Sequence, residues 1–230
     1  YVLQNTSANP LNDQWEFKGK LATPSDKWAI DGNVFEYNNQ RYMAWSGWEG
    51  DANGQQDLFI AKMSDPLTLS GKRVKISSPT YPWERNGDLG TAGNPEQVYV
   101  NEGPQFLEHN GKLFIVFSAS GCWTDFYALG LLSLEGTDPM DASAWTKKEE
   151  PIFQQTPENS VYAPGHNSFF KSPDGTEDWI LYHANSNPGE GCGNKRAPRM
   201  QRLYWQEDGT PFIGTPLPTS VILPIPSENE

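Results

Sequence analysis

Hydrophobic and polar residues alternate in short segments, and one arrangement of these segments occurs three times along the chain. Each copy begins with a short alternating segment, passes through a turn rich in Asn, Asp or Gly, and continues into an aromatic segment. The paired segments are 31–36 with 41–46, 102–107 with 112–118, and 166–170 with 179–183. Two alternating segments joined by such a turn predict an antiparallel β-hairpin.

A further alternating segment follows each hairpin, at 57–62, 128–134 and 200–205. Segments 74–77 and 211–214 are predicted to be the last strands of the first and third copies. Four strands in a repeat of roughly 65–70 residues are typical of a propeller blade with long outer loops. Residues 1–20 are predicted to be the outer half of an earlier blade. The pattern therefore predicts an all-β propeller, with three full blades and a fragment in this chain.

Three polar residues mark the starts of the hairpins: Asp31, Glu102 and His166. The innermost strand of each propeller blade lines the central channel, so these residues are expected at equivalent, converging positions. Burying a carboxylate without a partner is costly. The repeat leaves two interpretations open, in which the acids either form a functional site or cap turns at a solvated channel mouth.

Composition narrows the range of partners. The chain of 230 residues has a net charge of −12, and 13% of its residues are aromatic. A strongly acidic surface disfavours nucleic acid and anionic lipid, and no apolar run approaches the ~18 residues of a membrane span. A neutral sugar, held by aromatic faces and by carboxylate and amide groups, fits this composition better.

Three smaller features of the sequence concern its cysteines, a possible glycosylation site and a charged segment. The only cysteines are Cys122 and Cys192, so a disulfide and a pair of free thiols are both open. The sequence Asn5-Thr6-Ser7 is a glycosylation sequon, which is a short and unspecific motif. The charged run 147–150 is interpreted as a solvated surface segment.

Several motifs together resemble glycoside hydrolase family 43. They are WAIDG at 28–32, NEGPQ at 101–105, APGHNS at 163–168 and RMQ at 199–201. YMAWSGWEG at 42–50 and FSASG at 117–121 resemble the arabinofuranosidase-like members. Each motif is short, but their order around one repeat makes the resemblance specific, and it extends over essentially the whole chain.

This resemblance implies a five-bladed β-propeller, of which about four blades are represented, and a secreted glycosidase that acts with inversion. Residues 1–230 are then expected to form a single catalytic domain that lacks the first blade. By position, Glu102 would be the general acid and Asp31 an auxiliary acid that orients it and tunes its pKa. Arg199 would reach toward the sugar.

His166 would lie near the channel centre, where some family members hold a calcium ion or a water molecule. No cofactor is expected to be required, and His166 is the candidate ligand for a calcium ion. A lone histidine does not define such a site, because hard cations bind several oxygen ligands. Trp28 and Trp123, next to strand starts or in loops, are the candidates for stacking on sugar rings, although most propeller tryptophans are core residues.

The sequence departs from the family pattern in one respect. The general base of the family is an aspartate in the first blade, and Asp13 and Asp26 are interpreted as turn residues instead. The base is thus expected on a missing first blade, which a separate chain or fragment would carry. Chemistry alone would pair Glu102 with Asp31, since inversion needs two carboxyl groups about 6.5–9.5 Å apart. A carboxyl group beside another carboxylate in an enclosed site should have a raised pKa.

Two classes of function follow from the sequence. The first is an exo-acting α-L-arabinofuranosidase that removes terminal residues from arabinan or arabinoxylan in hemicellulose degradation, with β-xylosidase activity as the nearest variant. The second is a non-catalytic carbohydrate-binding propeller. Neither involves nucleic acid or a membrane.

Overall fold

The computed structural model describes residues 1–11, 14–87 and 98–228, and in this part of the chain regular structure is almost entirely β. The first strands are β1 (Val2–Gln4), β2 (Glu16–Gly19), β3 (Ala29–Tyr37), β4 (Gln40–Gly47), β5 (Asp57–Asp65) and β6 (Thr68–Ser77). They are followed by β7 (Asn101–His109), β8 (Lys112–Ala119), β9 (Ala128–Leu134) and β10 (Trp145–Lys147). The last are β11 (Tyr162–Lys171), β12 (Asp178–Asn185), β13 (Ala197–Trp205) and β14 (Pro211–Phe212). Three short 3-10 turns, η1 (Pro82–Glu84), η2 (Ala142–Ala144) and η3 (Pro157–Asn159), complete the described elements.

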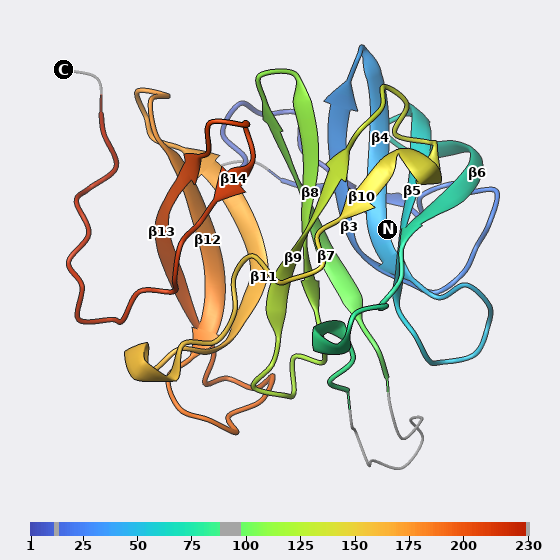
Figure 1. Cartoon of the computed structure of the whole chain (residues 1–230). Coiled ribbons are helices and arrows are strands. Elements are labelled where there is room, and N and C mark those ends of the chain that lie inside the picture. Colours follow the sequence, from blue (N-terminus) through green and yellow to red (C-terminus); the bar gives the residue numbers. More distant parts are fainter. Residues whose placement is uncertain (12–13, 88–97, 229–230) are drawn as a thin grey trace.

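The strands form three antiparallel four-stranded sheets in chain order, β3–β6, β7–β10 and β11–β14, and a separate pair, β1–β2. Figure 1 shows the three sheets side by side, with the β7–β10 sheet, coloured from green to yellow, between the other two. The predicted propeller architecture of three blades and a fragment is confirmed. None of the described helices is long and apolar enough to span a membrane.

Two clusters of the hydrophobic core lie between the blades, and a third lies around Trp45 and Phe59 of the first blade. Alternate residues of β8 face opposite sides, so Ile115 and Phe117 pack toward the first blade while Phe114 and Val116 pack toward the third. Because both faces of this strand are buried, its sequence is an almost continuous apolar run. The second blade is therefore held on both sides and gives its inner strand, β7, a fixed position.

One strand of the second blade was not predicted. Trp145–Lys147 forms β10, which pairs with β9. The interpretation of run 147–150 as wholly solvated is wrong at its first residue, since Lys147 forms an ion pair with Glu84, a residue with no solvent exposure. The alternating pattern is too short here to predict a strand of three residues.

Cys122 and Cys192 form a disulfide, which decides between the two alternatives that the sequence left open. The bond joins the loop after β8 to the loop after β12. Asp125 supports the same connection, because its carboxylate accepts hydrogen bonds from the backbone N–H of Gly189 at 2.8 and 3.1 Å. The loops of the second and third blades are thus tied together beside the inner strands.

Candidate active site

The inner strands β3, β7 and β11 each carry a β-bulge at the same register position. In the first blade the bulge follows the Ile30–Ser46 pair, and in the second it follows the Glu102–Ser118 pair. In the third blade it follows the Gly165–His183 pair. A β-bulge bends the strand and redirects side chains, and bulges recur beside active sites.

The register corrects the predicted equivalence of the three polar residues. Asp31 and His166 are equivalent and have positive φ angles of 58° and 50°. In the second blade this position is Gly103, with φ 57°, so Glu102 stands one residue earlier. Gly103 also lies against the imidazole, because a Cβ there would be 3.3 Å from Nδ1 of His166.

Despite this offset, the three side chains converge. The imidazole of His166 lies between the two carboxylates, with Nε2 3.8 Å from Oδ1 of Asp31 and Nδ1 3.9 Å from Oε1 of Glu102. Asp31 accepts a hydrogen bond from the backbone N–H of Gly103 at 3.2 Å, directly next to Glu102. The side chains of Asp31 and Glu102 are 19% and 13% exposed, so both acids are largely enclosed.

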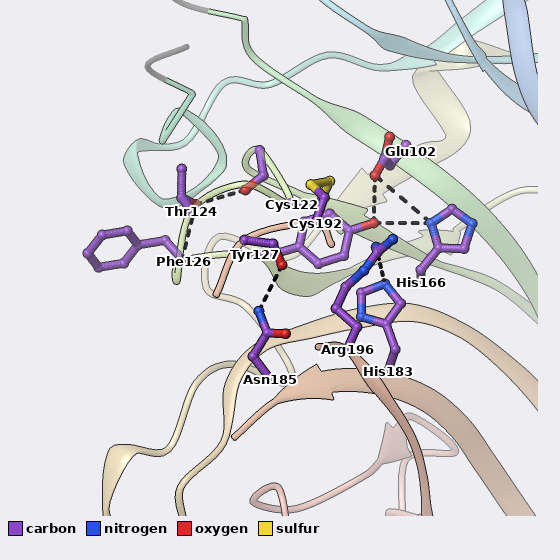
Figure 2. The surroundings of a disulfide bond; sticks show 12 residues. Glu102, Cys122, Thr124, Phe126, Tyr127, His166, His183, Asn185, Cys192 and Arg196 are labelled. Atoms are coloured by element: carbon purple, nitrogen blue, oxygen red, sulfur yellow. Dashed lines mark hydrogen bonds and ion pairs between the residues drawn. A yellow bond between two sulfur atoms is a disulfide. The ribbon is translucent and has the colours of Figure 1, made fainter. Parts of the chain in front are cut away.

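Tyr127 completes this cluster and was not predicted. Its hydroxyl donates to Oε1 of Glu102 at 2.6 Å and lies 3.2 Å from Nδ1 of His166. Figure 2 shows the hydroxyl directed at both groups. The oxygen therefore connects the acid to the imidazole.

The register of the repeat shows how Tyr127 could have been found. It directly precedes the third strand of its blade, and Gln56 and Arg196 hold the same position in the first and third blades. Gln56 accepts a hydrogen bond from Ser46, and Arg196 lies 3.1 Å from Nε2 of His183. In all three blades the residue before the third strand contacts a polar group near the inner strand.

Charge and burial shift several pKa values at the site. Burial raises the pKa of Asp31, an effect that His166 opposes and the charge of Glu102 reinforces. Burial disfavours the charged form of a carboxyl group, and a second carboxylate nearby acts in the same direction. The interaction with Glu102 raises the pKa of His166 against the effect of burial, and Asp31 adds to it. A protonated imidazole between two carboxylates is thereby favoured.

The surrounding groups are held in their neutral forms. Burial raises the pKa of the Tyr127 phenol well above its ordinary value, with Glu102 adding to the shift. Burial, together with the nearby Arg196 guanidinium, lowers the pKa of His183 to about 4. Tyr127 is therefore a hydrogen-bond donor to the carboxylate, and His183 is an acceptor for Arg196 near neutral pH.

Two open cavities border the cluster. Asp31 lines one of ≈ 410 Å³, together with Trp45 and Arg73. His166 lines the other, of ≈ 370 Å³, together with His183 and Arg196. Each has the size of a small-ligand site, and both combine aromatic or apolar walls with a few polar groups, as sugar-binding sites require.

Comparison with known proteins gives the family. The family model of Glycosyl hydrolases family 43 matches residues 1–211. The chain belongs to glycosyl hydrolase family 43. This confirms the resemblance that the motifs indicated.

The similar proteins are mostly arabinofuranosidases. The chain is 38% identical over 96% of its length to an extracellular exo-α-(1→5)-L-arabinofuranosidase of Streptomyces avermitilis. It is 37% identical over 95% of its length to α-L-arabinofuranosidase 43 of Humicola insolens. It spans 45% and 44% of these two proteins.

A solved structure supports the same assignment. The crystal structure of an α-L-arabinofuranosidase from Lactobacillus brevis matches with a TM-score of 0.84 and 32% identity, over 96% of this chain and 66% of that one. The fold of this family 43 chain is accordingly that of the five-bladed propeller, of which the described residues form three complete blades and a further strand pair.

Of the other predicted site residues, Arg199 forms its hydrogen bonds at the end of β12. It lies on β13, the third strand of its blade, and is 9% exposed. Its guanidinium donates to the backbone oxygen of Asn185 at 3.2 Å and to Oγ of Ser186 at 2.9 Å. Its predicted contact with the sugar stays a prediction, while Arg196 is the arginine that borders the His166 cavity.

Of the two predicted sugar-stacking tryptophans, Trp28 directly precedes β3 and Trp123 lies in the loop after β8. Trp28, 37% exposed, stacks on Trp48 with ring centroids 4.7 Å apart. Trp123 follows Cys122, and its ring packs over Gly121, where a Cβ would approach to 2.3 Å. The stacked pair of Trp28 and Trp48, beside the start of β3, is suited to contact the face of a sugar ring. Sugar stacking stays a prediction for both Trp28 and Trp123.

Of the two aspartates upstream of Asp31, the structure describes Asp26. Asp26 forms an ion pair with Lys20. Asp13 lies outside the described residues.

Calcium binding by His166 also stays a prediction. Among the residues that the structure describes, no group of three or more His, Cys, Asp or Glu side chains is arranged to hold a metal ion. The imidazole offers nitrogen atoms, whereas calcium binds six to eight oxygen atoms in proteins. The described side chains alone therefore do not fit a calcium ion here, and no chemical step below involves one.

Proposed function

We propose that this chain is the catalytic part of an α-L-arabinofuranosidase that releases terminal residues from arabinan or arabinoxylan. The observation that carries the proposal is the enclosed cluster of Glu102, His166 and Asp31, in a chain 38% identical to an exo-acting arabinofuranosidase. An acid that is held by hydrogen bonds at converging strand ends is suited to protonate a leaving group.

In the proposed reaction Glu102 donates its proton to the glycosidic oxygen as the bond from that oxygen to the anomeric carbon breaks. A water molecule attacks this carbon from the opposite face of the sugar and loses a proton to a general base, so the configuration inverts. Glu102 ends as a carboxylate and recovers its proton from solvent.

Asp31 is proposed as the auxiliary acid and not as the base. Inverting enzymes need room for a water molecule between acid and base. Here the imidazole of His166 lies between the two carboxylates, which supports the auxiliary role. Asp31 holds the backbone next to Glu102 through the N–H of Gly103, and this contact orients the acid.

The general base is assigned by the family pattern to an aspartate of a blade that precedes Asp31. Asp26 pairs with Lys20, and this contact supports the view that it is not the base. The base would be supplied by the same polypeptide or by a separate chain.

We further propose that the protein acts outside the cell. One similar protein is named as extracellular. The Cys122–Cys192 bond supports this location, since disulfides persist in oxidising environments.

The test compares hydrolysis of 4-nitrophenyl α-L-arabinofuranoside, 4-nitrophenyl β-D-xylopyranoside and debranched arabinan. We expect turnover of the arabinofuranoside and release of arabinose from arabinan, with NMR showing β-arabinofuranose as the first-formed anomer. Turnover of the xyloside alone would instead indicate a β-xylosidase. Binding of arabino-oligosaccharides without turnover of any substrate would indicate a carbohydrate-binding propeller.

A further inference from the structure

Tyr127 is buried more completely than either carboxyl group near it. It has 0% exposure and directly precedes β9. Its ring packs against Gly165, where a Cβ would approach a ring carbon to 2.4 Å, and stacks on His183 with ring centroids 5.8 Å apart. The ring cannot swing away without displacing β11, so the position of its hydroxyl is fixed by the fold.

The hydrogen atoms of this hydroxyl contact can be assigned from chemistry. The Tyr127 O–H donates to Oε1 of Glu102 at 2.6 Å, so Oε1 accepts through a lone pair. The phenol oxygen then has only lone pairs to offer to Nδ1 of His166, 3.2 Å away. His166 therefore carries a proton on Nδ1 in this arrangement.

We propose that Tyr127 is a positioning residue that directs the catalytic proton of Glu102 to Oε2. Because the phenol donates to Oε1, a proton on that oxygen would face another proton. The acid form of Glu102 therefore carries its proton on Oε2, where it is available to the glycosidic oxygen. The proposal deepens the proposed function and rests on it for the role of Glu102.

The opposite arrangement makes a different prediction. If a proton stood on Oε1, Tyr127 would accept from Glu102 and donate to His166, whose Nδ1 would then be bare. The two arrangements differ in whether Nδ1 of the His166 imidazole carries a proton. Its tautomer is measurable whether or not the protein turns over a substrate.

The first experiment is a ¹⁵N NMR titration of the imidazoles in the wild type, Tyr127→Phe and Tyr182→Phe. Tyr182 is a matched control, because it is buried and donates its hydroxyl to Gln201 at 3.2 Å in the third blade. The three histidines are assigned by replacing His109 and His183 in turn with Gln.

Above the titration of His166 we expect the Nδ1-protonated tautomer in the wild type and in Tyr182→Phe. In Tyr127→Phe the lost acceptor should shift His166 toward the Nε2-protonated form. A bare Nδ1 on His166 in the wild type would overturn the proposal.

The second experiment measures kcat/KM on aryl α-L-arabinofuranosides, from 2,4-dinitrophenyl to unsubstituted phenyl. Acidic phenols leave without protonation, whereas phenol needs the general acid. Loss of a hydrogen bond to a charged group should lower the rate of Tyr127→Phe on the phenyl substrate by about 10- to 100-fold and leave the dinitrophenyl rate nearly unchanged. Tyr182 lines the cavity beside His166, so any change in Tyr182→Phe should be of equal size on the phenyl and the dinitrophenyl substrate.

The outcomes separate this proposal from the proposed function. A loss of equal size on every substrate in Tyr127→Phe would indicate a merely structural role and overturn the proposal. If Glu102→Gln shows no dependence on the leaving group, the proposed role of Glu102 fails instead. The tautomer of His166 still decides the donor assignment of Tyr127 in that case.

Discussion

The buried ion pair between Lys147 and Glu84 should be necessary for the stability of the second blade. Glu84 has no solvent exposure, and Nζ of Lys147 lies 2.8 and 3.0 Å from its two carboxylate oxygens. The carboxylate also accepts from the backbone N–H groups of Thr80 and Tyr81, both at 2.8 Å, and from the amide of Asn101 at 2.9 Å. Asn101 directly precedes Glu102, so this network also supports the start of β7.

We expect Lys147→Met to destabilise the fold because it leaves the carboxylate of Glu84 buried without its cation. Breaking a buried pair from one side costs about 3–5 kcal/mol. These donors remain in the variant and place the expected loss near the lower end, at about 3 kcal/mol. For a chain of this length that corresponds to a fall in Tm of about 6–12 °C.

Thermal unfolding followed by circular dichroism, together with urea denaturation, measures this loss. Lys148→Met is the matched control, since the neighbouring side chain is exposed and the same substitution there should change stability by less than about 0.5 kcal/mol. Adding Glu84→Gln to Lys147→Met should recover part of the loss by removing the buried charge. A fall in Tm no larger for Lys147→Met than for Lys148→Met would refute this reasoning.

Three further predictions concern the site and its supports. Asp31→Asn should raise the free energy of unfolding near neutral pH, because burial raises the pKa of Asp31 and so penalises its carboxylate in the folded state. Urea titrations measure this gain, which should shrink as the pH falls through the raised pKa and vanish below the ordinary value of 3.8. Reducing the Cys122–Cys192 bond, which closes a sequence separation of 70, should cost about 2–5 kcal/mol, so melting with and without reductant should differ by several degrees. Gly165→Ala should cost about 1–3 kcal/mol in chemical denaturation, since its Cβ would meet the Tyr127 ring at 2.4 Å; an unchanged midpoint would contradict the close packing there.

The blades could be predicted from the sequence because the alternation of polar and apolar residues has the period of a strand and recurs with its turns. The convergence of Asp31, Glu102 and His166 followed from the same repeat. The one-residue offset of Glu102 did not, since it depends on which residue takes the left-handed conformation of the bulge. Gly103 adopts it readily, and this leaves Glu102 on the regular pair before it.

Contacts between distant parts of the chain were the harder features to predict. Tyr127 reaches Glu102 and His166 across the boundary between two blades, and no local pattern distinguishes it from a core tyrosine. Lys147 belongs to a charged run that is otherwise exposed, and only the burial of Glu84 gives it a role. The register of the repeat, once known, identifies the position of Tyr127 in all three blades.

The central claim is that Glu102 is the general acid of an arabinofuranosidase. Its most direct test is the turnover of phenyl α-L-arabinofuranoside by Glu102→Gln and by Glu108→Gln, which changes an exposed glutamate on the same strand. We predict that Glu102→Gln loses at least about 100-fold in kcat/KM while still binding arabinose, and that Glu108→Gln equals the wild type. Equal activity of the two variants would contradict the account.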